Sequence, residues 1–181
     1  MISFITYICE DAGVFPGNYV SATCDLPVLP QELMPQSGKR TDNDSAHITL
    51  IYSQHSNVDR KLIHTILGMV TDKFPLTVDH FECFDAVPKE GESDENKCTL
   101  VAKVKSAFAV VLHDTFKTLG MEHSYPEFSP HISIAYDVDR EEGYQVKDKL
   151  NAWLLANPHT ITVETKQFNV QAIDKDWVKK L

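Results

Sequence analysis

The sequence predicts a single α+β domain that spans residues 1–181 and is built from two lobes as a pseudo-repeat. Two observations support this fold class. The order strand, helix, strand is expected roughly twice along the chain, and no proline- or serine-rich linker separates the two passes. In addition, the hexapeptides HITLIY (47–52) and HISIAY (131–136) have the same form and occupy similar places in the two halves.

In the first half, runs of β-branched, aromatic and alternating apolar residues predict three strands. These strands cover residues 2–9, 18–26 and 47–52. A turn at 13–17 joins the first two, and a polar, proline-containing loop at 27–45 precedes the third. Apolar residues at helical spacing predict a helix over residues 59–74, with Asp59 near its start as an N-cap.

The second half begins with strands expected over residues 75–84 and 98–104, on either side of a charged hairpin loop at 88–96. A helix is expected over residues 106–119, where Ser106 is the N-cap and Gly120 follows the end. Its buried side is expected to consist of its apolar residues, which are Phe108, Val111, Leu112, Phe116 and Leu119. The remaining elements are strands at 131–136 and 160–173 with a helix at 139–157 between them.

The formal net charge is −9, and an acidic surface repels a phosphodiester backbone at long range. This disfavours a protein that tracks along DNA or long RNA, but it leaves room for a small nucleotide in a pocket. The N-terminus lacks the layout of a signal peptide, and no apolar run reaches the length of a membrane span, so a cytoplasmic protein is expected. The four cysteines form no CxxC pair and are expected to be free, buried thiols. They are Cys9, Cys24, Cys83 and Cys98.

Each hexapeptide places an imidazole and a hydroxyl on one face of its strand, because side chains two residues apart in a strand point the same way. The first pairs His47 with Thr49, and the second pairs His131 with Ser133. The opposite face is expected to pack into the core and consists of Ile48, Leu50, Tyr52, Ile132, Ile134 and Tyr136. If the halves are related by pseudo-symmetry, the two polar pairs meet across one cleft.

Two imidazoles across a cleft suit the cleavage of a phosphodiester that has a neighbouring 2′-hydroxyl. One imidazole takes a proton from the nucleophile while the other gives a proton to the leaving group. The hydroxyls donate hydrogen bonds to oxygens that gain charge in the transition state, and no metal is required. A third example of the motif, His113-Asp114-Thr115, is set aside because it lies in an expected helix, where i and i+2 do not face each other.

The repeated His-x-Ser/Thr motif resembles that of the two-histidine phosphoesterases, and the resemblance covers both halves of the chain. YPEFSPHISIAYD (125–137) is similar to the second motif of the phage anti-CBASS nucleases, and HITLIYS (47–53) and GNYV (17–20) extend that similarity. The resemblance implies antiparallel sheets that line a central cleft, with helices outside. It also implies metal-independent cleavage of cyclic di- or trinucleotide messengers such as cGAMP to linear products, which antagonises bacterial CBASS antiviral signalling.

Carried over to this chain, the resemblance implies that His47 and His131 form the acid–base pair and that Thr49 and Ser133 hold the phosphate. Which histidine is the base and which is the acid stays open. No cofactor and no metal are expected. The expected partner is a cyclic oligonucleotide rather than a long nucleic acid or a membrane, and a phage-encoded protein would act in the host cell cytoplasm.

Four further residues are placed by the same resemblance. Tyr19 and Trp177 are candidates for stacking on bases, with a core or strand-edge role as the alternative for Tyr19. Gln171 lies where the family tends to make a polar contact to a base. Lys103 stands where the relative carries an acid, and it either touches a phosphate or is solvated.

Two other functions stay open at this point. The first keeps the catalyst and changes the substrate, giving an RNA 2′,3′-cyclic phosphodiesterase or a 2′,5′-oligonucleotide phosphodiesterase, which should show a basic track leading to the cleft. The second is a non-catalytic sponge that binds the cyclic nucleotide, although a sponge has no need of two imidazoles. His80 and Cys83 have the spacing of half a zinc site, but no second half follows, so a structural role is favoured.

Overall fold

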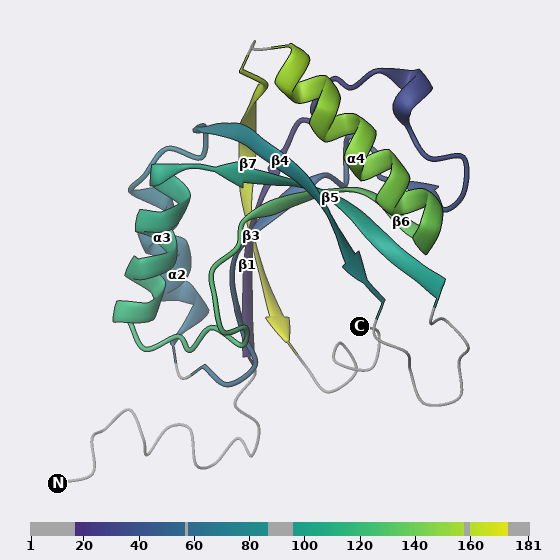
Figure 1. The fold of residues 1–181 in the computed structure, drawn as a ribbon. Helices are drawn as coiled ribbons and strands as arrows, with labels where there is room; N and C mark the ends of the chain where they lie inside the picture. Colours follow the sequence, from purple (N-terminus) through teal and green to yellow (C-terminus); the bar gives the residue numbers. More distant parts are fainter. Residues whose placement is uncertain (1–16, 57, 87–95, 158–159, 174–181) are drawn as a thin grey trace, which may run out of the picture.

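The computed structural model describes residues 17–56, 58–86, 96–157 and 160–173, which form one seven-stranded antiparallel sheet with α-helices on its outside (Figure 1). The strand order is β2-β6-β5-β4-β7-β1-β3. The strands are β1 (Gly17–Cys24), β2 (Lys39–Arg40), β3 (His47–Ser53), β4 (Pro75–Asp85), β5 (Lys97–Lys105), β6 (His131–Asp139) and β7 (Thr162–Ile173). The helices are the 3-10 helix η1 (Gln31–Leu33) and the α-helices α2 (Arg60–Gly68), α3 (Ala107–Thr118) and α4 (Arg140–Ala156). The predicted α+β fold class is confirmed.

Strand β7 belongs to both lobes of the sheet. Its first residues, Thr162 to Glu164, pair with β4, and from Thr165 onward it pairs with β1. One lobe therefore contains β1, β3 and most of β7, and the other contains β4, β5, β6 and the short β2. Strands β3 and β6 stand near opposite ends of the strand order yet contact each other, so the sheet bends back on itself. This bend brings the two hexapeptides together.

The point where β7 changes partners is buried and hydrogen-bonded. Thr165 is 1% exposed, and its hydroxyl accepts a hydrogen bond of 2.9 Å from the backbone N–H of Phe74. The same hydroxyl donates to the carbonyl of Asp72. Both partners lie just before β4. The side chain of Thr165 therefore joins β7, the strand shared by the two lobes, to the segment that leads into β4 of the second lobe.

The helices cover the outer surfaces of the two lobes. Helices α3 and α2 pack against β3 and β7 of the first lobe, and α4 lies over β4, β5 and β6 of the second (Figure 1). Each α-helix begins at a residue whose side chain accepts a hydrogen bond from the first turn, namely Asp59, Ser106 or Asp139, as N-caps do. Gly120, at φ +97°, follows α3 as expected. No helix in the described part of the chain is long and apolar enough to cross a membrane.

The elements lie close to their expected positions, with three differences. Helix α2 ends at Gly68 rather than at residue 74, since glycine is a poor helix former and the chain turns there toward β4. Strand β2 and the 3-10 helix η1 both lie inside the segment expected to be a loop, and β2 pairs with β6. Val111 was expected in the core but is 60% exposed. The buried stripe of α3 is instead Ala109, Leu112, His113 and Phe116, and this stripe turns Val111 outward.

The three cysteines in the described ranges, Cys24, Cys83 and Cys98, are buried and free, as predicted. Burial raises the pKa of the Cys24 and Cys83 thiols to about 12, so both stay protonated at neutral pH. Cys9, the strand expected at 2–9 and the loop expected at 88–96 lie outside the described residues.

Gly38 permits the pairing of β2 with β6, and replacing it by alanine should destabilise the protein. Its φ of +76° disfavours a side chain, and a Cβ there would lie 2.4 Å from the carbonyl oxygen of Tyr136. We expect Gly38→Ala to lower the free energy of unfolding by about 2–4 kcal/mol, measured by urea denaturation. Gly120→Ala is the matched control, because Gly120 also has positive φ but open space around it, and it should cost only about 1 kcal/mol. Equal losses for the two variants would contradict a role for the close approach at Gly38.

Candidate active site

His47 and His131 are held in the same way, one on β3 and one on β6. The Nδ1 atom of each ring lies 2.8 Å from the carbonyl oxygen of the residue two positions earlier, Ser45 for His47 and Ser129 for His131. A carbonyl oxygen only accepts, so each Nδ1 carries a proton and donates it. In a neutral imidazole this leaves Nε2 unprotonated and available for proton transfer.

A cavity of about 400 Å³ lies between the lobes and receives side chains from both. Its lining consists of Thr49, Phe84, His123, Tyr125, Glu127, Phe128, Ser129 and His131. Thr49 comes from β3, whereas His131 comes from β6, so the hydroxyl of one motif and the imidazole of the other share one cavity. His47 is close enough to His131 for the two rings to influence each other electrostatically.

The two hydroxyl residues of the motifs lie two residues after their histidines, on the same face of each strand. The Oγ1 atom of Thr49 is 3.1 Å from the phenol oxygen of Tyr19. Ser133 is partly exposed and pairs with Val101 of β5, two residues along β6 from His131. Of the four motif residues, Thr49 and His131 line the cavity. His47 and Ser133 share the strand faces of these two residues but do not line the cavity.

A β-bulge follows the hydroxyl residue in both motifs. In β3, Val20 and Ser21 of β1 pair with Ile51 and Thr49, so Leu50 is the extra residue. In β6 the same irregularity makes Ile134 the extra residue. The bulge carbonyls are both hydrogen-bonded, since His113 Nδ1 donates to Leu50 at 2.8 Å and the backbone N–H of Thr41 donates to Ile134 at 2.9 Å.

The bulges overturn the prediction that the tyrosines closing the hexapeptides share the faces of Ile48 and Ile132, although Tyr52 is buried as expected, at 4% exposed. An extra residue shifts the alternation by one, so Tyr52 lies on the face of His47 rather than on that of Ile48. It pairs directly opposite Tyr19, and their ring centroids are 6.2 Å apart. Tyr136 is 37% exposed instead of buried. Tyr52 therefore packs against the ring of Tyr19, and Tyr136 lies at the surface.

Aromatic rings surround the two histidines. The ring of Tyr19 meets that of His47 at 6.3 Å, and Phe84 meets His131 at 4.8 Å, both edge to face. Tyr125, from the loop between α3 and β6, packs 5.7 Å from Tyr52 and is 57% exposed. These rings give the cavity mostly apolar walls beside the polar motif residues.

Burial is the main cause that lowers the pKa of His131 below the usual value for histidine. The ammonium of Lys103 and the imidazole of His47 act in the same direction, while the hydrogen bond to Ser129 and the carboxylate of Glu82 oppose them. Burial also raises the pKa of Tyr19, so its phenol stays neutral and keeps its hydrogen bond with Thr49. At a given pH, His131 is therefore less protonated than a free histidine.

The structure places one of the two remaining predicted site residues, Gln171, and does not describe the other, Trp177. Gln171 is exposed on β7 and pairs directly opposite Tyr19, which puts it beside the cleft. Trp177 lies outside the described residues. His113 lies in α3 and is 3% exposed, as expected for the motif that was set aside, but it has a structural task at the bulge of Leu50. His80 lies on β4 beside Asp79, and no cluster of three metal-ligating side chains occurs in the described ranges.

Several residues of the site were missed by reasoning from the sequence. Tyr125 stands in the motif at 125–137, but neither it nor Phe84 is predicted from the sequence to line the cavity. Ser45 and Ser129 were also missed, although both repeats extend two residues upstream as Ser-x-His. That longer repeat was a usable signal, because a residue two positions before each histidine supplies the carbonyl that orients the ring.

Comparison with known proteins finds one matching family. The family model described as Anti-CBASS protein Acb1 matches residues 31–180. The anti-CBASS protein Acb1 of Vibrio phage KVP40 is 27% identical over 125 residues, which cover 67% of this chain and 73% of that protein.

Solved structures with a similar arrangement include Escherichia coli LigT. Its complex with 3′-AMP is 16% identical with a TM-score of 0.44, covering 87% of this chain and 88% of that one. The complex with ATP is 15% identical with a TM-score of 0.43, covering 88% of each chain.

Proposed function

This chain belongs to the family of anti-CBASS protein Acb1, and from that premise we propose that it is a phosphodiesterase that degrades cyclic oligonucleotide messengers and so antagonises CBASS signalling. The observation that carries the proposal is the matched pair of histidines, each held by Nδ1 with Nε2 left for proton transfer. His131 lines the cavity, and His47 is near enough to His131 to act on it electrostatically. The substrates are cyclic di- and trinucleotides, and the products are linear.

The reaction needs one proton to leave the nucleophile and one to reach the leaving group. One imidazole takes the proton of the ribose 2′-hydroxyl as its oxygen forms a bond to phosphorus. The other imidazole, protonated at the start, gives its Nε2 proton to the departing 5′-oxygen as that P–O bond breaks. A linear nucleotide ending in a 2′,3′-cyclic phosphate results. No water enters, and the enzyme ends with its protons exchanged between the two histidines.

Thr49 and Ser133 hold the phosphate between the imidazoles. Their hydroxyls lie on the same strand faces as the histidines, so they donate to the non-bridging oxygens on which charge grows. Tyr19, through its hydrogen bond of 3.1 Å, restricts the rotation of the Thr49 side chain. Each motif therefore contributes one proton-transfer group and one phosphate-binding group.

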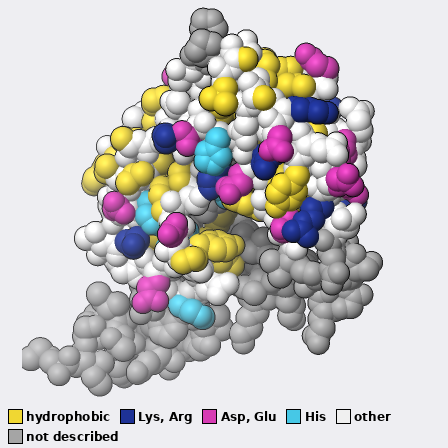
Figure 2. Space-filling view, viewed as in Figure 1, with side chains coloured by type: hydrophobic (Ala, Val, Ile, Leu, Met, Phe, Trp, Pro, Cys, Tyr) yellow, Lys and Arg dark blue, Asp and Glu magenta, His cyan; other side chains and the backbone are white. Residues whose placement is uncertain are grey.

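The surface favours a small cyclic messenger over a long RNA. Acidic and basic side chains are interspersed on the face drawn in Figure 2, and they form no continuous basic track there. Together with the net charge of −9, this disfavours a long polyphosphate. A cavity of about 400 Å³ lies in the range typical of sites for small ligands.

Product analysis by liquid chromatography and mass spectrometry tests the proposal. Purified protein in EDTA is incubated with 3′,3′- and 2′,3′-linked cyclic di- and trinucleotides, and with RNA ending in a 2′,3′-cyclic phosphate. We expect linear products from the cyclic messengers. Turnover of the RNA end alone would instead identify an RNA-end enzyme, and tight binding without turnover would identify a sponge.

Replacing Tyr125 by alanine should weaken substrate binding more than catalysis. The ring lines the cavity and is exposed, so it offers a face on which a base stacks. Base–aromatic stacking is worth roughly 1–3 kcal/mol, so we expect KM to rise about tenfold or more with kcat changed less. Steady-state kinetics measures both. Tyr144→Ala on α4 is the control, since Tyr144 is partly exposed but contacts Asp85 instead of the cavity, and an equal effect there would contradict stacking on Tyr125.

A further inference from the structure

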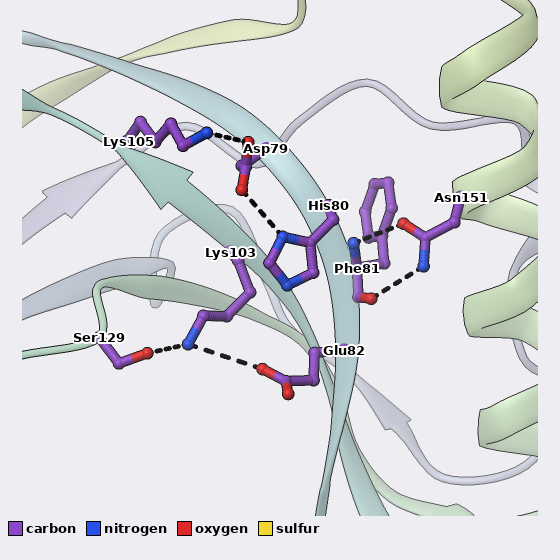
Figure 3. A network of polar contacts seen from close by, with 8 residues as sticks. All are labelled: Asp79, His80, Phe81, Glu82, Lys103, Lys105, Ser129 and Asn151. Atoms are coloured by element: carbon purple, nitrogen blue, oxygen red, sulfur yellow. Dashed lines mark hydrogen bonds and ion pairs between the residues drawn. The ribbon is translucent and has the colours of Figure 1, made fainter. Parts of the chain in front are cut away.

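Lys103 lies directly opposite His131 in the pairing of β5 with β6. Its side chain is only 15% exposed, although lysine is usually well solvated. Figure 3 shows its ammonium between the Ser129 hydroxyl and the Glu82 carboxylate, which is 3.6 Å away. The ammonium also lies 5.3 Å from the centre of the Phe84 ring, the same ring whose neighbour is His131.

Lys103 is thus joined to His131 through two intermediaries. The Ser129 hydroxyl accepts a hydrogen bond from the Lys103 ammonium, and the Ser129 carbonyl accepts one from His131 Nδ1. Phe84 packs against the imidazole edge to face and against the ammonium by cation–π attraction. Lys103 itself does not line the cavity. It therefore acts on His131 from behind the residues that face the substrate.

The two histidines are alike in their Nδ1 bonds but unlike in their neighbours. The residue opposite His47 in the pairing of β1 with β3 is Thr23, which is neutral. The charged and titratable groups that act on His131 are Lys103 on β5, Glu82 on β4 and His47 on β3. Glu82 partly offsets the ammonium, because the two form an ion pair. The ion pair of Lys103 and Glu82 therefore makes the surroundings of His131 different from those of His47.

We infer that Lys103 is a positioning residue that makes His131 the general base and leaves His47 as the general acid. The inference rests on the proposed function. A cation beside an imidazole disfavours the imidazolium, so His131 begins the reaction neutral and is ready to accept the 2′-hydroxyl proton. The lowered pKa of His131 is consistent with this role. His47, with no cation opposite it, is the histidine that enters the reaction protonated.

The pH dependence of kcat/KM tests the assignment. Activity falls on the acidic side as the base is protonated, so the acidic limb reports His131. We expect Lys103→Met to move this limb upward by roughly half to one pH unit, because the repulsion that lowers the pKa is removed. At about pH 6 this lowers kcat/KM by roughly three- to tenfold, with a smaller loss at pH 8. Lys103→Arg should restore the limb.

One control variant and one further test variant complete the experiment. Lys105→Met makes the same change two residues along β5, where the side chain is 73% exposed and pairs with Asp79, and it should leave the limb in place. Glu82→Gln should move the limb downward, the opposite direction, and it keeps the inference testable if Lys103→Met does not fold. A limb unchanged by both Lys103→Met and Glu82→Gln would overturn the inference. A shift of the alkaline limb instead would show His131 to be the acid.

A measurement without substrate separates this inference from the proposed function. Titration of the ¹³C-labelled His131 imidazole by NMR should show a higher pKa in Lys103→Met than in the wild type, whatever the protein cleaves. If the wild type does not turn over cyclic nucleotides, the proposed function fails while this titration still reports the coupling of Lys103 to His131. If the wild type is active and the titration is unchanged, only the inference about Lys103 fails.

Discussion

Replacing either His47 or His131 by alanine lowers kcat by about a thousandfold or more, while the Kd for the cyclic messenger changes by less than about tenfold. A positioned acid or base contributes about 10²–10⁴ to the rate, and the reaction needs both. Neither ring is part of the buried core, since both are partly exposed, so the substitutions should leave the fold intact. The double variant should be little worse than either single variant, because the two groups act in one concerted proton transfer.

Single-turnover kinetics and isothermal titration calorimetry measure the two quantities separately. His64→Ala is a suitable control, because His64 is exposed on α2 and lies outside the residues that line the cavity. A variant of His131 that keeps a tenth of the wild-type rate would contradict an acid–base role for that residue. Loss of binding together with loss of turnover would point to a structural effect.

Removing the motif hydroxyls has the second largest expected effect. Thr49→Val and Ser133→Ala keep the strand and delete a donor, and each should lower kcat by about a hundredfold. The donors act on charge that develops in the transition state, so the affinity for the ground-state messenger should fall much less. Comparison of kcat with Kd for each variant measures this difference.

The control for Thr49→Val is Thr23→Val. Thr23 lies on β1 opposite His47 and uses its hydroxyl on the carbonyl of Gln167 rather than in the cavity. A second variant, Tyr19→Phe, removes the partner of Thr49 and should cost less than the loss of Thr49 itself. A Thr49→Val variant with full activity would exclude a phosphate-binding role for that hydroxyl.

The order of strands and helices and the repeated hexapeptide together predict the α+β fold class, and the hexapeptide predicts the strands that carry His47 and His131. Alternation within a strand correctly paired each histidine with its hydroxyl residue, since that relation spans only two positions. The partner strands were not predictable, because pairing across β7 depends on contacts between residues far apart in the chain. Whether these residues catalyse the reaction stays a prediction until the variants are measured.

The direction of Tyr52 was missed for a specific physical reason. A bulge adds a residue to one strand without any mark in the hydrophobic pattern, because Leu50 and Ile51 are both apolar and both buried. The carbonyl of the bulged residue, Leu50, accepts a hydrogen bond from His113, which is 63 residues away along the chain. Only the packed structure shows that the buried histidine of α3 and the bulge of β3 depend on each other.

The strand shared by both lobes makes the catalyst mechanically stiff. A hinge needs a short segment whose backbone can rotate freely, but β7 crosses between the lobes inside a paired strand, at the buried Thr165. The two histidines therefore stand on one continuous frame, and their spacing is set before a ligand arrives. Under the proposed function, a messenger that enters the cleft would meet the two imidazoles at a spacing already set by the sheet.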